Sequence, residues 1–491
     1  MLTDLNLTPQ PPRHLDADVC ICGAGPAGIV LALELARRRP DWRIVLLEGG
    51  GRSLASERER ILYDVGLAAK SYAVAASRRR MLGGTSGHWG GWCKPLDPAD
   101  FTAPAAWSVP DWPITLDELQ PFLAPAHVWC EIPSDRYDPD EVRARQPQRF
   151  LELPADGPVA ERLFRFSPPT RFGARYADEL AGQSNLDGLL HANLFALERR
   201  GDRIVSASAR ALDGKPVRIS ARRFVLAQGG LETTRTLLNL RGDASDDGEG
   251  LRSPHLGRYF ADHYGVSPGT VLAPAELGYR RMADQDTAVM PVLAPSPGAL
   301  RQAGRQNVCL MLAHDPADDS LPASYATHAA LGFSTRAFWS YRAQMIVEPR
   351  PHPESRITLT DTRCELGLRR AHLDWRLHPQ DTASALAFFD DLGTVLAQSG
   401  QGRTRLTYEA TPARLASVNG ANHHLGTVRF AHDPRDGVAD ADGRIHDMEN
   451  LYVASSALFP RYGYSNPTLT IVALAIRLAS RWAGESAAAG T

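Results

Sequence analysis

The first 50 residues follow the hydrophobic pattern of a β-strand, a helix and a second β-strand. Residues 17–22 and 42–48 are apolar runs of strand length, and residues 26–38 place apolar side chains at helical spacing. Residues 224–228 form another apolar run that enters a glycine turn, and a helix is expected over residues 231–240. This order predicts a parallel sheet covered by helices.

The middle of the chain has a different pattern. Residues 101–180 hold many prolines and short apolar segments, which is typical of loops and short helices. Residues 343–348, 355–359 and 371–376 alternate between apolar and polar positions, and residues 383–399 have the spacing of a helix. We therefore expect an antiparallel sheet with an accompanying helix in this region.

The α/β pattern returns near the end, with a strand at 450–454 and a helix at 467–483. Residues 195–210 and 216–219 are expected to form hairpin strands before the strand at 224–228. These patterns predict one discontinuous α/β domain and a second α+β domain inserted in two pieces. The first domain is assigned residues 1–100, 186–269 and 416–491, and the second is assigned residues 101–185 and 270–415.

Composition places the chain among ordinary globular proteins. Of its 491 residues, 43% are hydrophobic and 22% are charged, which excludes a fibrous or disordered chain. The 54 basic and 56 acidic side chains leave a net charge of −2, so nucleic acid is not expected as a partner. The six cysteines contain no CxxC pair, and we expect reduced thiols and no metal cluster.

Neither a signal peptide nor a membrane span is expected. The N-terminus lacks a basic segment followed by an apolar one, and no apolar stretch of roughly 20 residues occurs. The sequence therefore predicts a soluble, cytoplasmic chain. Export together with a partner subunit stays open.

A glycine-rich turn joins the first strand to the first helix. Gly23, Gly25 and Gly28 form G-x-G-x-x-G, in which the second glycine lets a pyrophosphate approach the backbone at the helix N-terminus. Glu48 ends the second strand, where its carboxylate can bind a ribose diol. The turn predicts a dinucleotide site for either FAD or NAD. The glycines that follow Glu48 favour FAD.

A second glycine-rich segment spans residues 81–91. Its glycines allow the backbone to lie flat against a planar ring, and Thr85 and Ser86 can donate hydrogen bonds to that ring. The basic run Arg78 to Arg80 precedes it, and most of that run is interpreted as a solvated turn. The residues predicted to face the cofactor are Gly83, Gly84, Thr85, Ser86, His88 and Trp89.

Two residues near the C-terminus could act on an alcohol. His423 is a candidate base, because an imidazole titrates near neutral pH, and Asn466 can bind the same oxygen. Asn466 precedes a predicted helix and could equally be a simple N-cap. A metal site at His423 and His424 is not expected, because adjacent strand residues point to opposite faces.

Several motifs resemble the glucose–methanol–choline (GMC) family of FAD-dependent oxidoreductases. They are DVCICGAGPAG, VLLEGG, LGGTSGHWGG, FVLAQGGLETTRTLL, LGRYFADH, HHLGT and NLYVASSALFPRYGYSNPTLTIVALAIRLA. The branch with pyranose oxidases, glycoside 3-oxidases and 3-dehydrogenases is most similar. The resemblance implies a Rossmann-like α/β FAD-binding domain with an inserted substrate-binding cap on an antiparallel sheet.

The resemblance also implies a set of cofactor contacts. FAD is expected to be held without a covalent bond, because His88 is followed by Trp89, Gly90 and Gly91 and not by the Thr-containing sequence that accompanies such bonds. A covalent link through His88 stays open. Ser455 stands where many relatives carry Asp. Beyond the glycine motifs, the residues implied are Leu194, Ala227, Gly229, Ser455, Pro467 and Thr468.

The implied reaction is oxidation of a secondary alcohol on a sugar or glycoside. His423 would accept the hydroxyl proton, Asn466 would position the oxygen, and a hydride would pass to flavin N5. Gln344 and Glu348 share one face of a predicted strand and are candidate substrate contacts. The acceptor could be oxygen, a quinone or a partner redox protein, and either a small partner subunit or a homo-oligomer is compatible.

Other functions stay open at this point. The substrate could be an aminoglycoside or another natural-product alcohol, and a non-redox lyase could use the same flavin scaffold. An NAD(P)H-linked flavoprotein would need a second nucleotide-binding motif, which the sequence lacks. A non-catalytic flavin-binding subunit is disfavoured by the presence of both His423 and Asn466.

Overall fold

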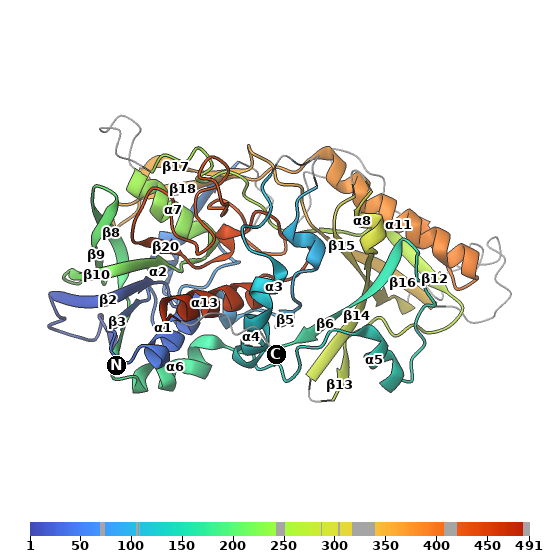
Figure 1. Cartoon of the computed structure of the whole chain (residues 1–491), viewed down its shortest axis with the longest axis horizontal. Helices are drawn as coiled ribbons and strands as arrows, with labels where there is room; N and C mark the ends of the chain where they lie inside the picture. Colours follow the sequence, from blue (N-terminus) through green and yellow to red (C-terminus); the bar gives the residue numbers. More distant parts are fainter. Residues whose placement is uncertain are drawn as a thin grey trace.

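The computed structural model shows an elongated molecule with one sheet at each end (Figure 1). The N-terminus lies beside the sheet built from the first strands. The structure describes residues 1–68, 74–104, 107, 109–241, 251–285, 287–302, 305–316, 339–406 and 420–484. Within these residues, no helix is both long and apolar enough to cross a lipid bilayer.

The first sheet contains the predicted βαβ unit, in which two buried parallel strands are connected by a helix. Its strand order is β1-β7-β3-β2-β10-β9-β8, with β20 paired to β10. The neighbouring strands β1, β7, β3, β2 and β10 run parallel to one another. β9 and β8 form an antiparallel hairpin, and β9 pairs with β10. The strands are β1 (Leu2–Asp4), β2 (His14–Cys22), β3 (Ile44–Leu47), β7 (Leu186–Leu190), β8 (Asn193–Arg200), β9 (Arg203–Arg210), β10 (Val217–Leu226) and β20 (Leu451–Val453).

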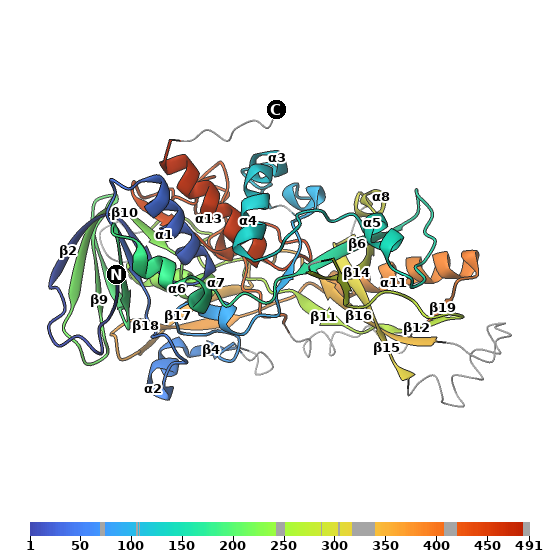
Figure 2. The same cartoon turned by 90° about the horizontal axis from the view of Figure 1, so that it is seen from below.

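Helix α1 (Pro26–Arg38) is packed between the sheet and other helices. Its residues 27–36 are all buried, because α13 (Thr468–Trp482) and α6 (Phe172–Gly182) cover the side that faces away from the strands. Figure 2 shows α1 and α13 side by side, with α4 (Leu123–Trp129) next to α13. The segment 101–185 therefore contributes helices to this end of the molecule.

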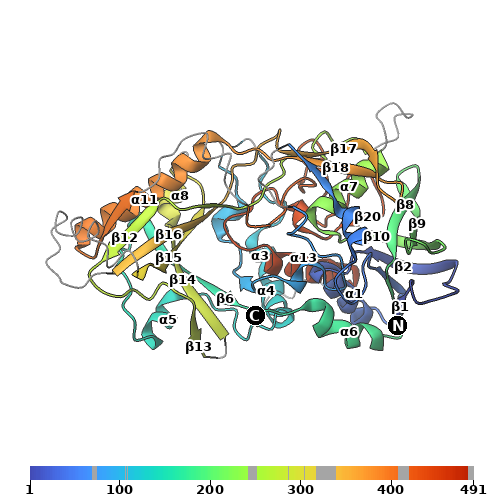
Figure 3. The same cartoon turned by 180° about the vertical axis from the view of Figure 1, so that it is seen from behind.

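The second sheet is antiparallel and lies at the other end. Its order is β19-β12-β16-β15-β14-β6-β5, with β11 on β16 and β13 on β14. Helix α11 (Pro379–Ser399) runs along one face, where Phe388 and Leu392 pack among sheet residues such as Leu310 (Figure 3). The strands are β5 (Trp92–Cys93), β6 (Val159–Phe166), β11 (Tyr264–Val266), β12 (Gly269–Ala273), β13 (Met282–Asp284), β14 (Thr287–Pro295), β15 (Val308–His314), β16 (Trp339–Val347) and β19 (Arg403–Leu406).

A third sheet corrects part of the sequence prediction. β17 (Arg356–Arg363) and β18 (Arg369–Asp374) form an antiparallel hairpin, but β18 pairs with β4 (Val65–Leu67), and neither strand belongs to the larger antiparallel sheet. The reason is packing: the apolar face of the hairpin covers α7 (Gly229–Arg241). Alternation predicted the strands but not the sheet to which they belong.

Several other boundaries differ from the predictions by a few residues, and two of these differences are described here. The segments 216–219 and 224–228 belong to one continuous strand, β10, which pairs with β2 along its length. Helix α11 begins before residue 383 because Pro379 starts it and Asp381 and His378 cap it. The short helices are α2 (Glu57–Arg60), η1 (Ile61–Tyr63), η2 (Gly84–Gly87), η3 (Pro98–Phe101), α3 (Leu116–Leu119), η5 (Gln120–Phe122), α5 (Pro139–Arg145), α8 (Pro297–Leu300) and η6 (Ser456–Leu458).

Candidate active site

A cavity of about 500 Å³ extends from the glycine turn after β2 to the start of α13. That volume lies within the range of about 300–1,000 Å³ that is typical of ligand sites. The cavity brings together most residues predicted for the site, although they come from distant parts of the chain. Those that line it are Gly23, Gly25, Glu48, Gly84, Thr85, Ser86, His88, Trp89, Leu194, Ala227, Gly229, His423, Ser455, Asn466, Pro467 and Thr468.

Two predicted glycines lie behind the cavity wall and do not line it. A Cβ atom at Gly28 would lie 1.9 Å from the Gly23 carbonyl oxygen, and one at Gly83 would lie 2.3 Å from the Gly173 nitrogen. Both glycines permit close packing of backbone segments. Gly25 is different, because a Cβ atom there would meet nothing within 4 Å. The open space at Gly25 is where a phosphate could approach the backbone.

The two substrate candidates also lie away from the cavity. Neither Gln344 nor Glu348 is among its lining residues. Glu348 is fully buried and accepts a hydrogen bond from Arg461 Nη2 at 2.8 Å. It shares a strand face with Ile346, which does line the cavity, but its carboxylate is held by the chain itself.

Glu48 lies where the motif predicts it, directly after β3. Its carboxylate accepts hydrogen bonds from the backbone N–H of Ala24 at 3.0 Å and of Gly50 at 2.8 Å. Burial raises the pKa of Glu48, while these two bonds and the nearby Arg80 act in the opposite direction. The carboxylate thus connects the glycine turn to the end of β3.

The basic run before the second glycine segment is not a solvated turn, so that prediction is wrong for two of its members. Arg80 is 7% exposed and donates to the Gly49 carbonyl at 3.1 Å. The Arg78 side chain is 8% exposed and pairs with Glu232 at 3.0 Å. All three arginines line the cavity. Their positive charges suit a phosphate-bearing ligand.

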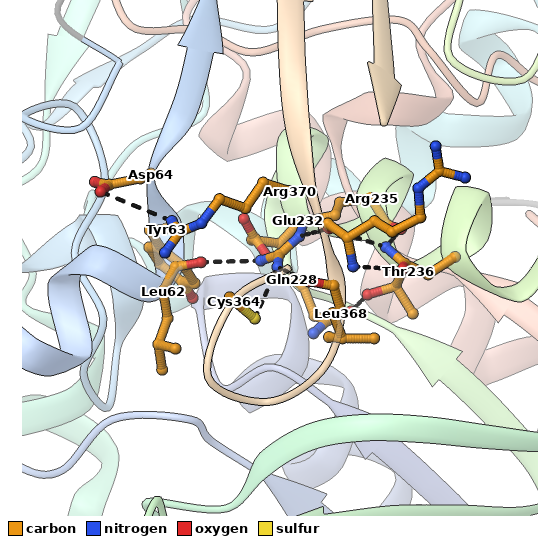
Figure 4. Close-up of polar contacts among 12 residues, drawn as sticks. Leu62, Tyr63, Asp64, Gln228, Glu232, Arg235, Thr236, Cys364, Leu368 and Arg370 are labelled. Carbon is orange, nitrogen blue, oxygen red and sulfur yellow. Dashed lines mark hydrogen bonds and ion pairs between the residues drawn. The ribbon is translucent and has the colours of Figure 1, made fainter. Parts of the chain in front are cut away.

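Arg235 lines the cavity, and Figure 4 shows its polar contacts. Its guanidinium is 3% exposed and bonds to the Leu62 carbonyl at 2.9 Å and to Glu232 at 3.2 Å. It also donates to Cys364 Sγ at 3.1 Å and to the Leu368 carbonyl at 3.4 Å. Arg235 of α7 therefore connects η1 to the β17–β18 hairpin through hydrogen bonds.

The side chains of His423 and Asn466 also line the cavity, where they are in contact. Asn466 Nδ2 lies 3.0 Å from His423 Nε2, and both residues are partly exposed to the cavity. The backbone of His423 is held by buried Asp262, whose carboxylate accepts the N–H groups of Asn422 and His423 at 2.9 and 2.8 Å. The pair predicted from sequence is thus in direct contact.

The surroundings keep His423 neutral. Burial lowers its pKa well below the usual 6.5, and His263 and His424 add to that effect. His424 points elsewhere and lies 3.2 Å from Ser77 Oγ, with its pKa lowered by burial and by Arg78 to about 3. A neutral imidazole can accept a proton.

The described residues contain no group of acidic, histidine and cysteine ligands that could hold a metal ion.

The start of α13 favours a role for Asn466 beyond capping. The helix has no side-chain N-cap, since Ser465 donates to the Pro95 carbonyl and the Asn466 amide reaches His423. The first N–H groups of α13 are therefore without a side-chain acceptor. They carry the positive end of the helix dipole at a point where Pro467 and Thr468 line the cavity.

Comparisons with known proteins agree with this arrangement. Residues 351–475 match the GMC oxidoreductase family model. The chain is 24% identical to the fructose dehydrogenase large subunit of Gluconobacter japonicus, over 95% of this chain and 97% of that protein. Residues 351–475 are thus a GMC oxidoreductase domain. The chain is an FAD-dependent oxidoreductase.

Two further relatives are informative. The 6'''-hydroxyparomomycin C oxidase of Streptomyces lividus is 28% identical over 61% of this chain and 53% of that protein. Pyridoxine 4-oxidase from Mesorbium loti has the same fold, with a TM-score of 0.60 and 21% identity over 96% of this chain and 99% of that one. The overall fold of this chain is therefore the one found in pyridoxine 4-oxidase.

The cavity fits FAD. Arg78 Nε, Arg80 Nε and Asn466 Oδ1 are buried and have no partner among the described residues. Two of these atoms are donors on arginines directly before the glycine-rich segment 81–91, and the third is an acceptor near His423. His88 also lines the cavity, where its Nδ1 accepts from Arg79 at 3.3 Å. A covalent link through His88 stays a prediction.

Two kinds of residue at the site were not predicted from the sequence. Arg78 and Arg80 could have been recognised, because cations directly before a glycine-rich cofactor loop are suited to phosphate. His263 lies in the LGRYFADH motif and contacts His423, with their Nδ1 atoms 2.8 Å apart. Only the pairing of the segments around Ala261 and Leu425 brings the two histidines together.

Proposed function

We propose that this chain oxidises a secondary alcohol of a sugar or glycoside to a ketone, with His423 as the base. The observation that carries the proposal is the contact between His423 Nε2 and Asn466 Nδ2 in the cavity. A hydroxyl group that enters between them can donate to the imidazole nitrogen while it accepts from the amide. His423 then takes the proton, and Asn466 holds the oxygen.

The cofactor contacts follow from the same cavity. When bound, FAD supplies the acceptor for the hydrogen and two electrons that leave the carbinol carbon. Gly25, Glu48 and Arg80 would hold its dinucleotide part, and the N–H groups at the start of α13 would face its ring system. The last arrangement places a positive dipole where negative charge develops.

The substrate class rests on the relatives. One is named for fructose and another for 6'''-hydroxyparomomycin C, so an aminoglycoside alcohol is the second candidate. We assign substrate binding to the part of the cavity beside the antiparallel sheet, where Trp92 of β5 and Ile346 of β16 line it. The name "fructose dehydrogenase large subunit" supports the proposal that a partner subunit accompanies this chain. The electron acceptor could be such a partner, oxygen or a quinone.

The test is anaerobic mixing of the FAD-loaded protein with a panel of alcohols. The panel contains fructose, simple glycosides, an aminoglycoside and a non-carbohydrate secondary alcohol. We expect the visible flavin absorbance to disappear with a sugar or aminoglycoside and to return on addition of air or a quinone. Unchanged absorbance with product formed would instead indicate a non-redox lyase.

A further inference from the structure

A hydrogen-bonded chain leads from buried Glu348 toward the base. Glu348, next to the end of β16, accepts Arg461 Nη2 at 2.8 Å and the N–H groups of Tyr462 and Gly463 at 3.1 Å each. Gly463 has φ +53°, and a Cβ atom there would lie 2.3 Å from Asp100 Oδ2. These contacts fix the turn and therefore the direction of the Gly463 carbonyl.

The Gly463 carbonyl determines which nitrogen of His263 carries hydrogen. His263 Nε2 lies 2.8 Å from that oxygen, which can only accept, so Nε2 must be protonated. His263 is fully buried, and burial lowers its pKa to about 4. The ring is therefore neutral near pH 7, and its Nδ1 carries a lone pair.

His263 in turn determines the state of His423. Their Nδ1 atoms are 2.8 Å apart, and because His263 Nδ1 accepts, His423 Nδ1 must donate. A neutral ring carries one hydrogen, so His423 Nε2 is left bare. It faces Asn466 Nδ2, which is a donor, at 3.0 Å. Each bond in the chain thus has one donor and one acceptor.

We propose that His263 is a positioning residue that fixes the tautomer of His423, so that the unprotonated Nε2 faces the cavity. The inference rests on the proposed function, in which Nε2 takes the hydroxyl proton. In water, the hydrogen of a neutral histidine prefers Nε2, and the hydrogen bond at the other nitrogen decides the tautomer in a protein. Without His263, the hydrogen would occupy the nitrogen that must act as base.

The direct test is the nuclear magnetic resonance spectrum of protein labelled with ¹⁵N at histidine, recorded with and without FAD. The signals of His423 and His263 are assigned by their loss in His423→Asn and His263→Phe. We expect His423 to be protonated at Nδ1 and His263 at Nε2. A His423 ring protonated at Nε2 in the wild-type protein would overturn the inference, whatever the activity.

The His263→Phe variant connects the tautomer to catalysis. We expect the His423 hydrogen to move to Nε2 and flavin reduction to slow by about 10²–10⁴-fold, as when a catalytic histidine is held in the wrong tautomer. Flavin content should stay unchanged. Flavin reduction at the wild-type rate in a folded His263→Phe protein would contradict the role of His263.

A matched control is His127→Phe. His127 is also buried, bonds to the Leu123 carbonyl and Tyr137, and lies outside the cavity. This variant should leave the His423 tautomer and the rate unchanged. If His423→Ala reduces flavin at the wild-type rate, the proposed function fails, and with it the catalytic role of His263, although the tautomer assignment stands.

Discussion

At the scale of the residue, the site depends on one imidazole that stays neutral in a buried setting. Burial and two neighbouring histidines lower the pKa of His423 well below 6.5. Asn466 contributes a donor at 3.0 Å, so the base and the group that positions the substrate oxygen share one hydrogen bond before substrate enters. Taken alone, the two residue types could equally have had structural roles, and it was the resemblance of their motifs to the GMC family that predicted them as a pair.

The pH dependence of flavin reduction follows from this pKa. The reaction needs neutral His423, so its rate should be constant above the pKa and fall as pH decreases through it. Because the pKa is lowered, we expect kcat/KM to keep its plateau through pH 6.5 and to decline only in more acidic buffer. An acid limb centred at or above pH 6.5 would contradict the neutral, buried base.

At the scale of the element, the turn between β2 and α1 shows how neighbouring glycines serve different needs. Gly28 allows the helix to contact the Gly23 carbonyl, whereas Gly25 faces open space in the cavity. The spacing in the sequence predicted the open approach at Gly25, and the third glycine of the G-x-G-x-x-G pattern is the one that lets helix and strand pack closely. Sheet membership of β17 and β18 could not be predicted, since alternation carries no information on the partner strand.

Alanine at Gly25 and at Gly28 should therefore have separable effects. Gly25→Ala should leave the unfolding free energy of the FAD-free protein nearly unchanged and weaken FAD binding, because the added methyl occupies the space at the turn. Gly28→Ala should destabilise the FAD-free protein itself, since its Cβ would clash with backbone. Urea unfolding and FAD titration measure the two quantities. Equal stability loss in both variants would contradict this division.

The residues after β16 provide a second prediction at this scale. Glu348→Ala leaves the guanidinium of Arg461 buried without its carboxylate, and removing one member of a buried ion pair costs about 3–5 kcal/mol. We expect that loss in the free energy of unfolding, measured in urea. Glu354→Ala, which removes a partly exposed partner of Arg258, is the control and should change stability far less. A loss in Glu348→Ala no larger than in this control would contradict the buried pair.

At the scale of the whole molecule, the cavity lies where segments from both ends and the middle of the chain meet. Composition and periodicity predicted the α/β and antiparallel parts, but the contacts at the cavity depend on tertiary packing. The sequence predicted Arg78 and Arg80 as exposed, and only the folded structure shows that they are buried. A role for His263 likewise follows only from its contact with His423. Glu348 appeared available on its strand, yet it is enclosed by the segment that contains Arg461.

Buried neutral histidines should also make the fold sensitive to acid. The folded-state pKa of His263 is about 4, below its value of 6.5 in the unfolded chain. Its contribution to stability is therefore complete above pH 6.5 and is lost as pH falls through about 4. Asp100 and Asp381, whose pKa values are raised by burial to about 7, act in the opposite direction.

Comparison with a variant isolates the histidine effect. The difference in unfolding free energy between wild type and His263→Phe should shrink as pH falls from 6.5 to 4, because the two aspartates contribute equally to both proteins. Urea unfolding at several pH values gives this difference. A difference that stays constant across the range would show that His263 is not held neutral in the fold.

In the proposed alcohol oxidation, His423 removes the hydroxyl proton of the substrate. Anaerobic single-turnover flavin reduction by wild type and His423→Ala tests this role, with the FAD content of each protein determined and with an alcohol that reduces the wild type. We expect bound FAD in both proteins and a rate about 10²–10⁴-fold lower in the variant. Reduction at the wild-type rate in FAD-loaded His423→Ala would show that His423 is not the base.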